Sequence, residues 1–139
     1  MSILDEASAL LTTSTVAGGA TGWPLYLGHL PDSSTIGDKA VGVIHTQGQG
    51  YMPRIGLEQE GLQIVVRGAP TNQTSTGYQD AMDRATLIAK AARDYVGTPT
   101  STGARWAGVW NESGPFFAGF DEGWRPLFSS NWRVWREST

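Results

Sequence analysis

One long amphipathic segment, Tyr78 to Val96, stands alone between segments of β-strand character, and this constrains the fold more than any other feature of the sequence. Its apolar residues recur at the helical period, which predicts a helix with one face in the core. Thr76 and Gln79 match a capping box at its start, and Gly97 and Pro99 follow as a stop signal. A chain with one such helix in its middle builds most of its remaining core from strands.

The clearest strand is predicted at Leu62 to Arg67, where side chains of alternating position face opposite sides of a sheet. One side carries Leu62, Ile64 and Val66, and the other carries Gln63, Val65 and Arg67. We expect Val65→Asp and Ile88→Asp each to unfold the domain, because burying an unpaired charge is costly.

The remaining elements follow from shorter patterns. A short helix is expected at Ile3–Leu11, with Asp5 and Glu6 favourably placed near its N-terminus. Trp106 and Trp110 are expected on one face of their strand. The other predicted strands and turns are strands Trp23–Leu30, Ala40–Thr46, Ala104–Trp110, Pro115–Phe120 and Arg125–Arg136, with turns at Asn111–Gly114 and Asp121–Gly123.

These elements give the order α-β-β-β-α-β-β(-β). Helices do not alternate with strands, so a doubly wound or barrel fold is not expected. The prediction is an α+β protein with a twisted, largely antiparallel sheet and two helices packed on one face. A length of 139 residues corresponds to one domain, spanning residues 1–139.

Composition and motifs argue against an enzyme and imply no cofactor. The chain has no cysteine, which excludes disulfides and thiolate sites. It has no phosphate-binding loop, and Gly48-Gln49-Gly50 is typical of a turn. A metal site is conceivable but not required by the spacing of its candidate ligands, His29, His45, Asp32 and Asp38. Paired carboxylates in the sequence are interpreted as solvated charge; the pairs are Asp5-Glu6, Glu58/Glu60 and Asp121-Glu122.

Charge and hydropathy also bear on partners. The net charge of −3 gives no basic surplus for specific binding of nucleic acid. No apolar stretch reaches the roughly 20 residues of a membrane-spanning helix, and the acidic start lacks the positive charge of a secretory signal. The expectation is a protein made in the cytoplasm without a membrane partner.

Apolar and aromatic residues outside the predicted elements indicate an interface. Gln47 to Gly61 is either a long loop or an extended hairpin arm, and it carries much apolar surface for a connection. It is either an arm that packs on a neighbouring subunit or partner, or an extended hairpin within its own chain. Most of the six tryptophans are expected in the core or in subunit contacts. Stacking on nucleobases is a third alternative. The candidate assembly interface consists of Tyr51, Met52, Arg54, Ile55, Leu57 and Trp124.

Five dispersed segments, taken in order, resemble the tail terminator (tail-completion, or minor capsid) family of long-tailed bacteriophages. Each motif is weak alone, but together they span nearly the whole chain. They are Ile3-Leu4-Asp5…Ala9-Leu10-Leu11, Tyr26-Leu27-Gly28-His29-Leu30-Pro31, Gln63-Ile64-Val65-Val66-Arg67-Gly68, Tyr78…Ala81…Ala85…Ile88…Ala89, and Arg125…Phe128-Ser129-Ser130-Asn131-Trp132.

The resemblance implies a homo-hexameric ring that caps the head-proximal end of the tail tube in the neck of the virion. Such a ring ends polymerisation of the tail tube protein and offers a surface to the head-side connector or stopper protein, with DNA only as passing cargo. Assembly would take place in the cytoplasm of the bacterial host. Arg54, Arg67 and Arg105 are candidates for ion pairs between subunits. The alternatives are another neck component, such as a head-completion or connector-stopper protein, a small Trp-rich domain that binds a ligand or nucleic acid, and a small hydrolase.

Overall fold

A computed structural model describes residues 2–18, 21–31, 38–52, 56–70, 76–93 and 95–137, with the backbone alone for residues 47–52. The chain forms two helices and five strands among these residues. In chain order they are α1 (Ile3–Thr13), β1 (Leu25–Leu27), β2 (Ala40–Met52), β3 (Leu57–Arg67), α2 (Gly77–Ala92), β4 (Trp106–Phe120) and β5 (Pro126–Glu137).

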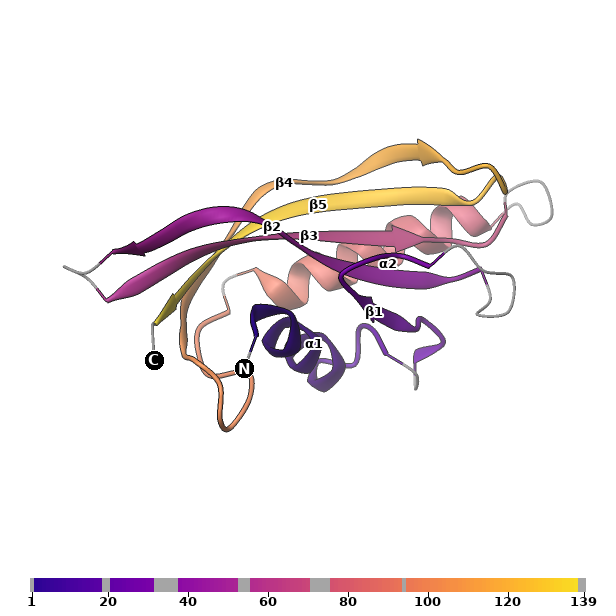
Figure 1. The fold of residues 1–139 in the computed structure, drawn as a ribbon. Coiled ribbons are helices and arrows are strands. Elements are labelled where there is room, and N and C mark those ends of the chain that lie inside the picture. Colours follow the sequence, from indigo (N-terminus) through magenta and orange to yellow (C-terminus); the bar gives the residue numbers. More distant parts are fainter. Residues whose placement is uncertain are drawn as a thin grey trace.

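The strands form one twisted sheet in the order β1-β2-β3-β5-β4, and both helices lie on the same side of it (Figure 1). β1 is parallel to β2, and the other neighbouring strands are antiparallel. The predicted α+β class and element order are therefore confirmed. A two-layer arrangement of this kind leaves one sheet face without a helix among the described residues.

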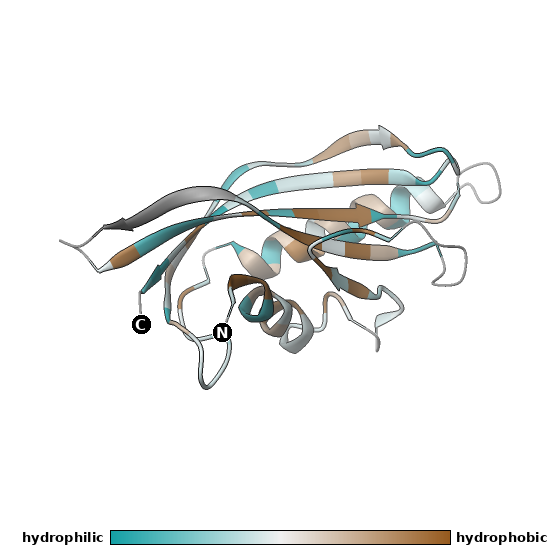
Figure 2. Ribbon diagram, viewed as in Figure 1, coloured by the Kyte–Doolittle hydropathy of each residue, from teal (hydrophilic) through white to brown (hydrophobic). Residues whose placement is uncertain are grey.

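Alternation along the strands decides which side chains enter the core. Leu62, Ile64 and Val66 are at most 4% exposed and face the helices, whereas Val65 lies half-buried on the opposite face. Figure 2 shows hydrophobic residues concentrated in the parts of β1, β2 and β3 that lie nearest the helices. Ile88 of α2 is buried in the same core, so the expectation that Ile88→Asp unfolds the domain stands. Val65 is not buried as the expectation for Val65→Asp assumed, so the reason for expecting that variant to unfold no longer holds.

The closing part of the chain differs from its prediction. We expected two strands joined by a turn at Asn111–Gly114, but β4 is one continuous strand of 15 residues paired with β5. Register shifts occur along it, the first between Trp106 and Gly108. This irregularity reverses the alternation, so Trp106 points into the core and Trp110 points away from it. The prediction that both tryptophans share a face was wrong for that reason.

Of the segment Gln47–Gly61, the described residues 47–52 and 57–61 belong to two antiparallel strands, in agreement with the extended-hairpin form of the prediction. β2 continues to Met52, well beyond the predicted end at Thr46, and β3 begins at Leu57. β3 pairs with β5 along its whole length, from Leu57 opposite Glu137 to Arg67 opposite Leu127. The glycines here are typical of turns, but pairing with neighbouring strands satisfies the backbone and overrides this local preference.

The helix ends also differ in detail. Ser2 and Asp5 form a reciprocal capping box at α1, whereas Thr76 makes no side-chain cap hydrogen bond at α2. α2 ends at Ala92, four residues before the predicted end at Val96, because Arg93 turns to extended backbone.

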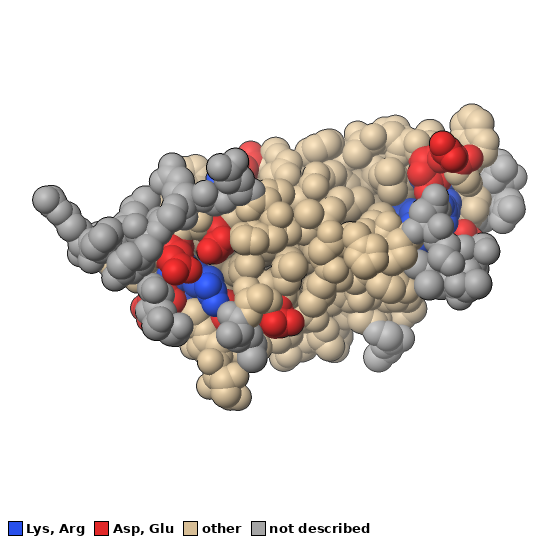
Figure 3. Space-filling view, in the orientation of Figure 1, with Lys and Arg blue, Asp and Glu red and all other residues tan. Residues whose placement is uncertain are grey.

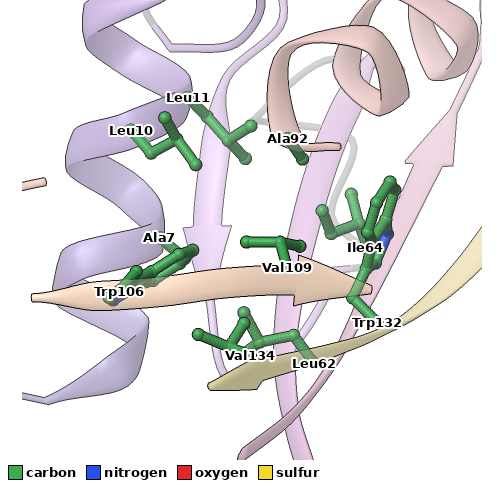
Figure 4. Close-up of a pocket in the computed structure, with 10 residues that line it drawn as sticks. All are labelled: Ala7, Leu10, Leu11, Leu62, Ile64, Ala92, Trp106, Val109, Trp132 and Val134. Atoms are coloured by element: carbon green, nitrogen blue, oxygen red, sulfur yellow. The ribbon is translucent and has the colours of Figure 1, made fainter. Parts of the chain in front are cut away.

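The core between α1 and the sheet is closed. The cavity shown in Figure 4 has a volume of about 10 Å³ and an entirely apolar lining. That volume is at the lower limit for one water molecule, which would also need polar partners. It is therefore a packing void and not a binding site. Its lining residues come from both helices and three strands: Ala7, Leu10, Leu11, Leu62, Ile64, Ala92, Trp106, Val109, Trp132 and Val134.

Candidate assembly surfaces

A fully buried carboxylate fastens α1 to the far edge of the sheet. Glu6 accepts hydrogen bonds from the backbone N–H of Ala104 at 2.8 Å and from Nε1 of Trp106 at 2.9 Å. It also accepts from Nε of Arg136 at 2.7 Å. A β-carbon at Gly103 would lie 2.5 Å from Oε2 of Glu6, so the loop needs glycine to approach this closely. The interpretation of Asp5-Glu6 as solvated charge was wrong for Glu6.

The ionisation of Glu6 follows from these contacts. Burial raises the pKa of Glu6, but hydrogen bonds from Arg136, Trp106 and Ala104 oppose it and leave the pKa below its ordinary value. Glu6 in turn raises the pKa of Arg136. Every polar atom of this carboxylate is directed at a structural partner and none at a solvent-filled cleft. The cluster is therefore suited to holding the fold, not to acid–base chemistry.

An aromatic cluster lies at the end of the sheet where β4 turns into β5. It consists of Tyr78, Phe117, Phe120, Trp124 and Phe128, whose ring centroids follow one another at 5.1 to 6.0 Å. Phe128 is buried, whereas the other four are 37 to 57% exposed. Exposed apolar groups that gather in this way are typical of interaction sites.

Local sequence patterns did not reveal this cluster. Phe117 and Phe120 would point to opposite faces of a regular strand. A register shift between Phe117 and Gly119 brings both rings to the helix side, next to Tyr78 at the start of α2. The dense aromatic composition of residues 116–124 is the signal that remained available in the sequence.

The structure does not bring the predicted interface residues together. Tyr51 and Met52 lie at the end of β2, and half-buried Leu57 begins β3, whereas Arg54 and Ile55 lie outside the described residues. Trp124 lies in the connection from β4 to β5, which Figure 1 shows at the end of the sheet opposite the end of β2. Between these ends runs the length of β3, about 34 Å at the usual rise per residue. The candidate residues therefore belong to two separate surfaces.

The other predicted sites are not assembled by the described residues. Nε2 of His45 lies 2.6 Å from Oε2 of Glu60. His29 is exposed, and Asp32 lies outside the described part of the chain. Within that part, no three histidine or acidic side chains form a group able to hold a metal ion.

Two of the three arginines proposed for subunit contacts have partners within the chain. Arg67 is 2% exposed and donates to the backbone carbonyls of Pro31 and Asp38. Arg105 contacts Glu137 at 3.2 Å. Arg54 lies outside the described residues.

The sheet face opposite the helices is broad and mostly uncharged. Figure 3 shows a wide area without charged side chains between charged groups at the two ends of the molecule. Trp110, 64% exposed, lies on this face beside an open hollow of about 240 Å³, which is also lined by Gln59, Glu112 and Arg133. The hollow is too open to enclose a small molecule, and its wall suits a flat protein contact better.

A second hollow, of about 330 Å³, lies beside α2. Lys39 and Arg84 both lie over the buried ring of Trp23, at 5.3 and 5.4 Å from its centroid. Asp80 and Asp83 line the same hollow, so its charges compensate one another and select no ligand charge.

Comparison with models of known protein families and with curated protein sequences finds no match to this chain. Neither α1 nor α2 is long and apolar enough to cross a membrane. The function proposed for this chain therefore rests on the surfaces described above.

Proposed function

We propose that this protein is a structural subunit of a tailed bacteriophage that forms a ring on the head-proximal end of the tail tube. In this role it ends tube polymerisation and provides the surface for joining the head. The observation that carries the proposal is that the two edges of one long sheet differ, with β2 and the short β1 on one side and β4 on the other, and that an exposed aromatic cluster lies at one end of the sheet. A ring needs two unlike, complementary surfaces on each subunit, because its contacts are head-to-tail.

The electrostatics support the same role. DNA that passes through a ring has to move freely, and a basic lumen would hold its phosphates. The chain has a net charge of −3, and Figure 3 shows no basic stripe on the face in view. A mildly acidic or uncharged wall repels phosphates weakly and lets DNA pass.

The test is the mass and shape of the purified protein over a concentration series, by light scattering and negative-stain imaging, with and without purified tail tubes. We expect closed rings of one size, either free or on one end of each tube. A protein that remains monomeric and leaves tube ends bare would refute the proposal. Binding to portal-filled heads instead of tubes would identify the alternative, a head-completion or connector-stopper protein.

A further inference from the structure

The sheet has an open edge on each side. β1 covers β2 only from Val41 to Val43, and Ile44–Met52 has no strand partner on that edge among the described residues. On the other side, Gly97 exchanges two backbone hydrogen bonds with Trp106, at 2.7 and 3.1 Å. Beyond Trp106, the outer edge of β4 has no backbone partner in the part of the chain that the structure describes.

Neither open stretch carries the charged side chains or prolines that usually block an edge, although register shifts interrupt β2 after Thr46 and β4 before Gly108. Edge strands in monomeric proteins are commonly blocked by charged side chains, proline or a covering segment. The sequence from Ile44 to Met52 contains no Lys, Arg, Asp, Glu or Pro, and the same holds from Ala107 to Asn111. Protective residues begin only further along β4, with Glu112 and Pro115. These two stretches are therefore suited to pairing with another strand.

The two stretches also lie at the same level of the sheet. Across the four strands, Thr46 is opposite Gly61, Gly61 is opposite Arg133, and Arg133 is opposite Trp110. Toward one end of the sheet from this level, β1 covers the edge of β2. Toward the other end, Gly97 covers the edge of β4. The open parts of the two edges therefore overlap in position, and β1 and Gly97 limit slippage, one in each direction.

Strand direction allows the two edges to meet. β2 and β4 run in opposite directions, since three antiparallel pairings separate them. A second copy in the same orientation therefore presents its β2 antiparallel to β4 of the first. We propose that subunits join by this pairing, β4 of one copy with β2 of the next around Trp110 and Thr46, so that the sheet continues from subunit to subunit. The proposal specifies the lateral contact of the ring proposed above and rests on that function.

A second copy fits both edges at once, which explains why both are unprotected. Each subunit uses one edge of each kind, and the right-handed twist of the sheet turns each copy relative to the last, as a closing ring requires. The pairing also covers Trp110, which is 64% exposed in the single chain. Its ring would lie beside Thr46 and Ile44 of the neighbour, an aromatic–β-branched contact that is favourable across strands.

Disulfide trapping tests this contact directly, because the chain has no cysteine of its own. The test variant carries Thr46→Cys and Trp110→Cys. Within one chain these positions are three strand spacings apart, about 14 Å, which is beyond the reach of a disulfide. The matched control carries Thr46→Cys and Phe116→Cys, since Phe116 lies on the same strand and is 44% exposed but is level with Gly42. The single-cysteine variants complete the set, and circular dichroism checks the fold of each.

On oxidation we expect the test variant to form a ladder of covalent oligomers that ends at the ring, about tenfold faster than the control pair. Rings without this ladder, or equal cross-linking of the control, would overturn the edge contact and leave the proposed function intact. A ladder without an upper limit, with filaments on the grid, would support the edge contact and refute the ring cap. Monomers without cross-links, with and without tail tubes, would overturn both.

Discussion

Replacing Glu6 with glutamine tests whether the buried carboxylate fastens the N-terminal helix to the sheet. Glu6 is 0% exposed and accepts hydrogen bonds from Trp106, Ala104 and Arg136. Glutamine has nearly the same size, but its NH₂ group would face these donors and its neutral oxygen could serve only some of them. Arg136 would keep its contact with the carboxylate of Glu58, at 3.2 Å.

The expected cost follows from these contacts. Removing one partner of a buried ion pair costs about 3–5 kcal/mol, because the other charge stays buried without compensation. Since Arg136 keeps its contact with Glu58, we expect a loss of unfolding free energy at the lower end of this range, about 3 kcal/mol. For a chain of this length that corresponds to a fall in Tm of about 10 °C and in the urea midpoint of about 1.5 M.

The same variant should change the pH dependence of unfolding. The pKa of Glu6 is below its ordinary value of 4.5 in the folded protein. Its contribution to stability is therefore complete above pH 4.5 and is lost as the pH falls through the folded pKa. Glu6→Gln removes this contribution, so the variant should lose less stability on acidification than the parent does.

Urea unfolding followed by tryptophan fluorescence measures both effects, since Trp106 and Trp132 are buried. The matched control is Asp5→Asn, which changes the neighbouring carboxylate in the capping box and should cause only a small loss. A cost below about 1 kcal/mol for Glu6→Gln would refute the reasoning, since it is within the range of an exposed ion pair. If Glu6→Gln loses as much stability at low pH as the parent does, that loss is not due to Glu6.

The other predictions concern surfaces and core. Ile88→Asp should abolish the cooperative unfolding transition, because Ile88 is 1% exposed and the new charge would be buried. Val65→Asp should leave a monomer that circular dichroism shows to be folded, because Val65 is only half-buried. Light scattering should show that this variant assembles less well. Tyr51→Asp with Ile55→Asp should block ring or tube assembly and leave the monomer folded; unchanged assembly would show that this segment is not an interface. Phe120→Ser should lower the free energy of unfolding by only about 1 kcal/mol, since Phe120 is 45% exposed. The same variant should co-sediment less with tail tubes. If it binds tubes as well as the parent does, the aromatic cluster is not part of that contact.

Periodicity predicted the fold well where packing and local pattern agree. The α2 stripe and the alternation of β3 led directly to buried Ile88 and Ile64. The errors fall where tertiary pairing decides. Glycines after Thr46 are typical of a turn, yet β2 continues because β3 supplies its hydrogen bonds. Local patterns contain no signal for such pairing.

The surfaces were harder to predict than the fold, for a related reason. The sequence indicates both Trp124 and Tyr51 as interface candidates, but it does not show that they lie at opposite ends of the sheet. Phe120 was missed because an irregularity in β4 decides which face it occupies. Glu6 was misjudged because its partners, Trp106 and Arg136, are far away along the chain.

The position of the two surfaces assigns them different tasks in the proposed ring. If subunits join edge to edge, the strands run along the ring axis or at a tilt to it, as in a barrel. Side chains at the strand ends then point toward the next object along the axis, not toward the neighbouring subunit. The aromatic cluster around Phe117 and Phe120 lies at one such end, and the β2–β3 tip lies at the other. One end would therefore contact the tail tube and the other the head side. Edge variants should prevent ring closure, whereas Phe120→Ser should yield normal rings that bind one of the two partners less tightly.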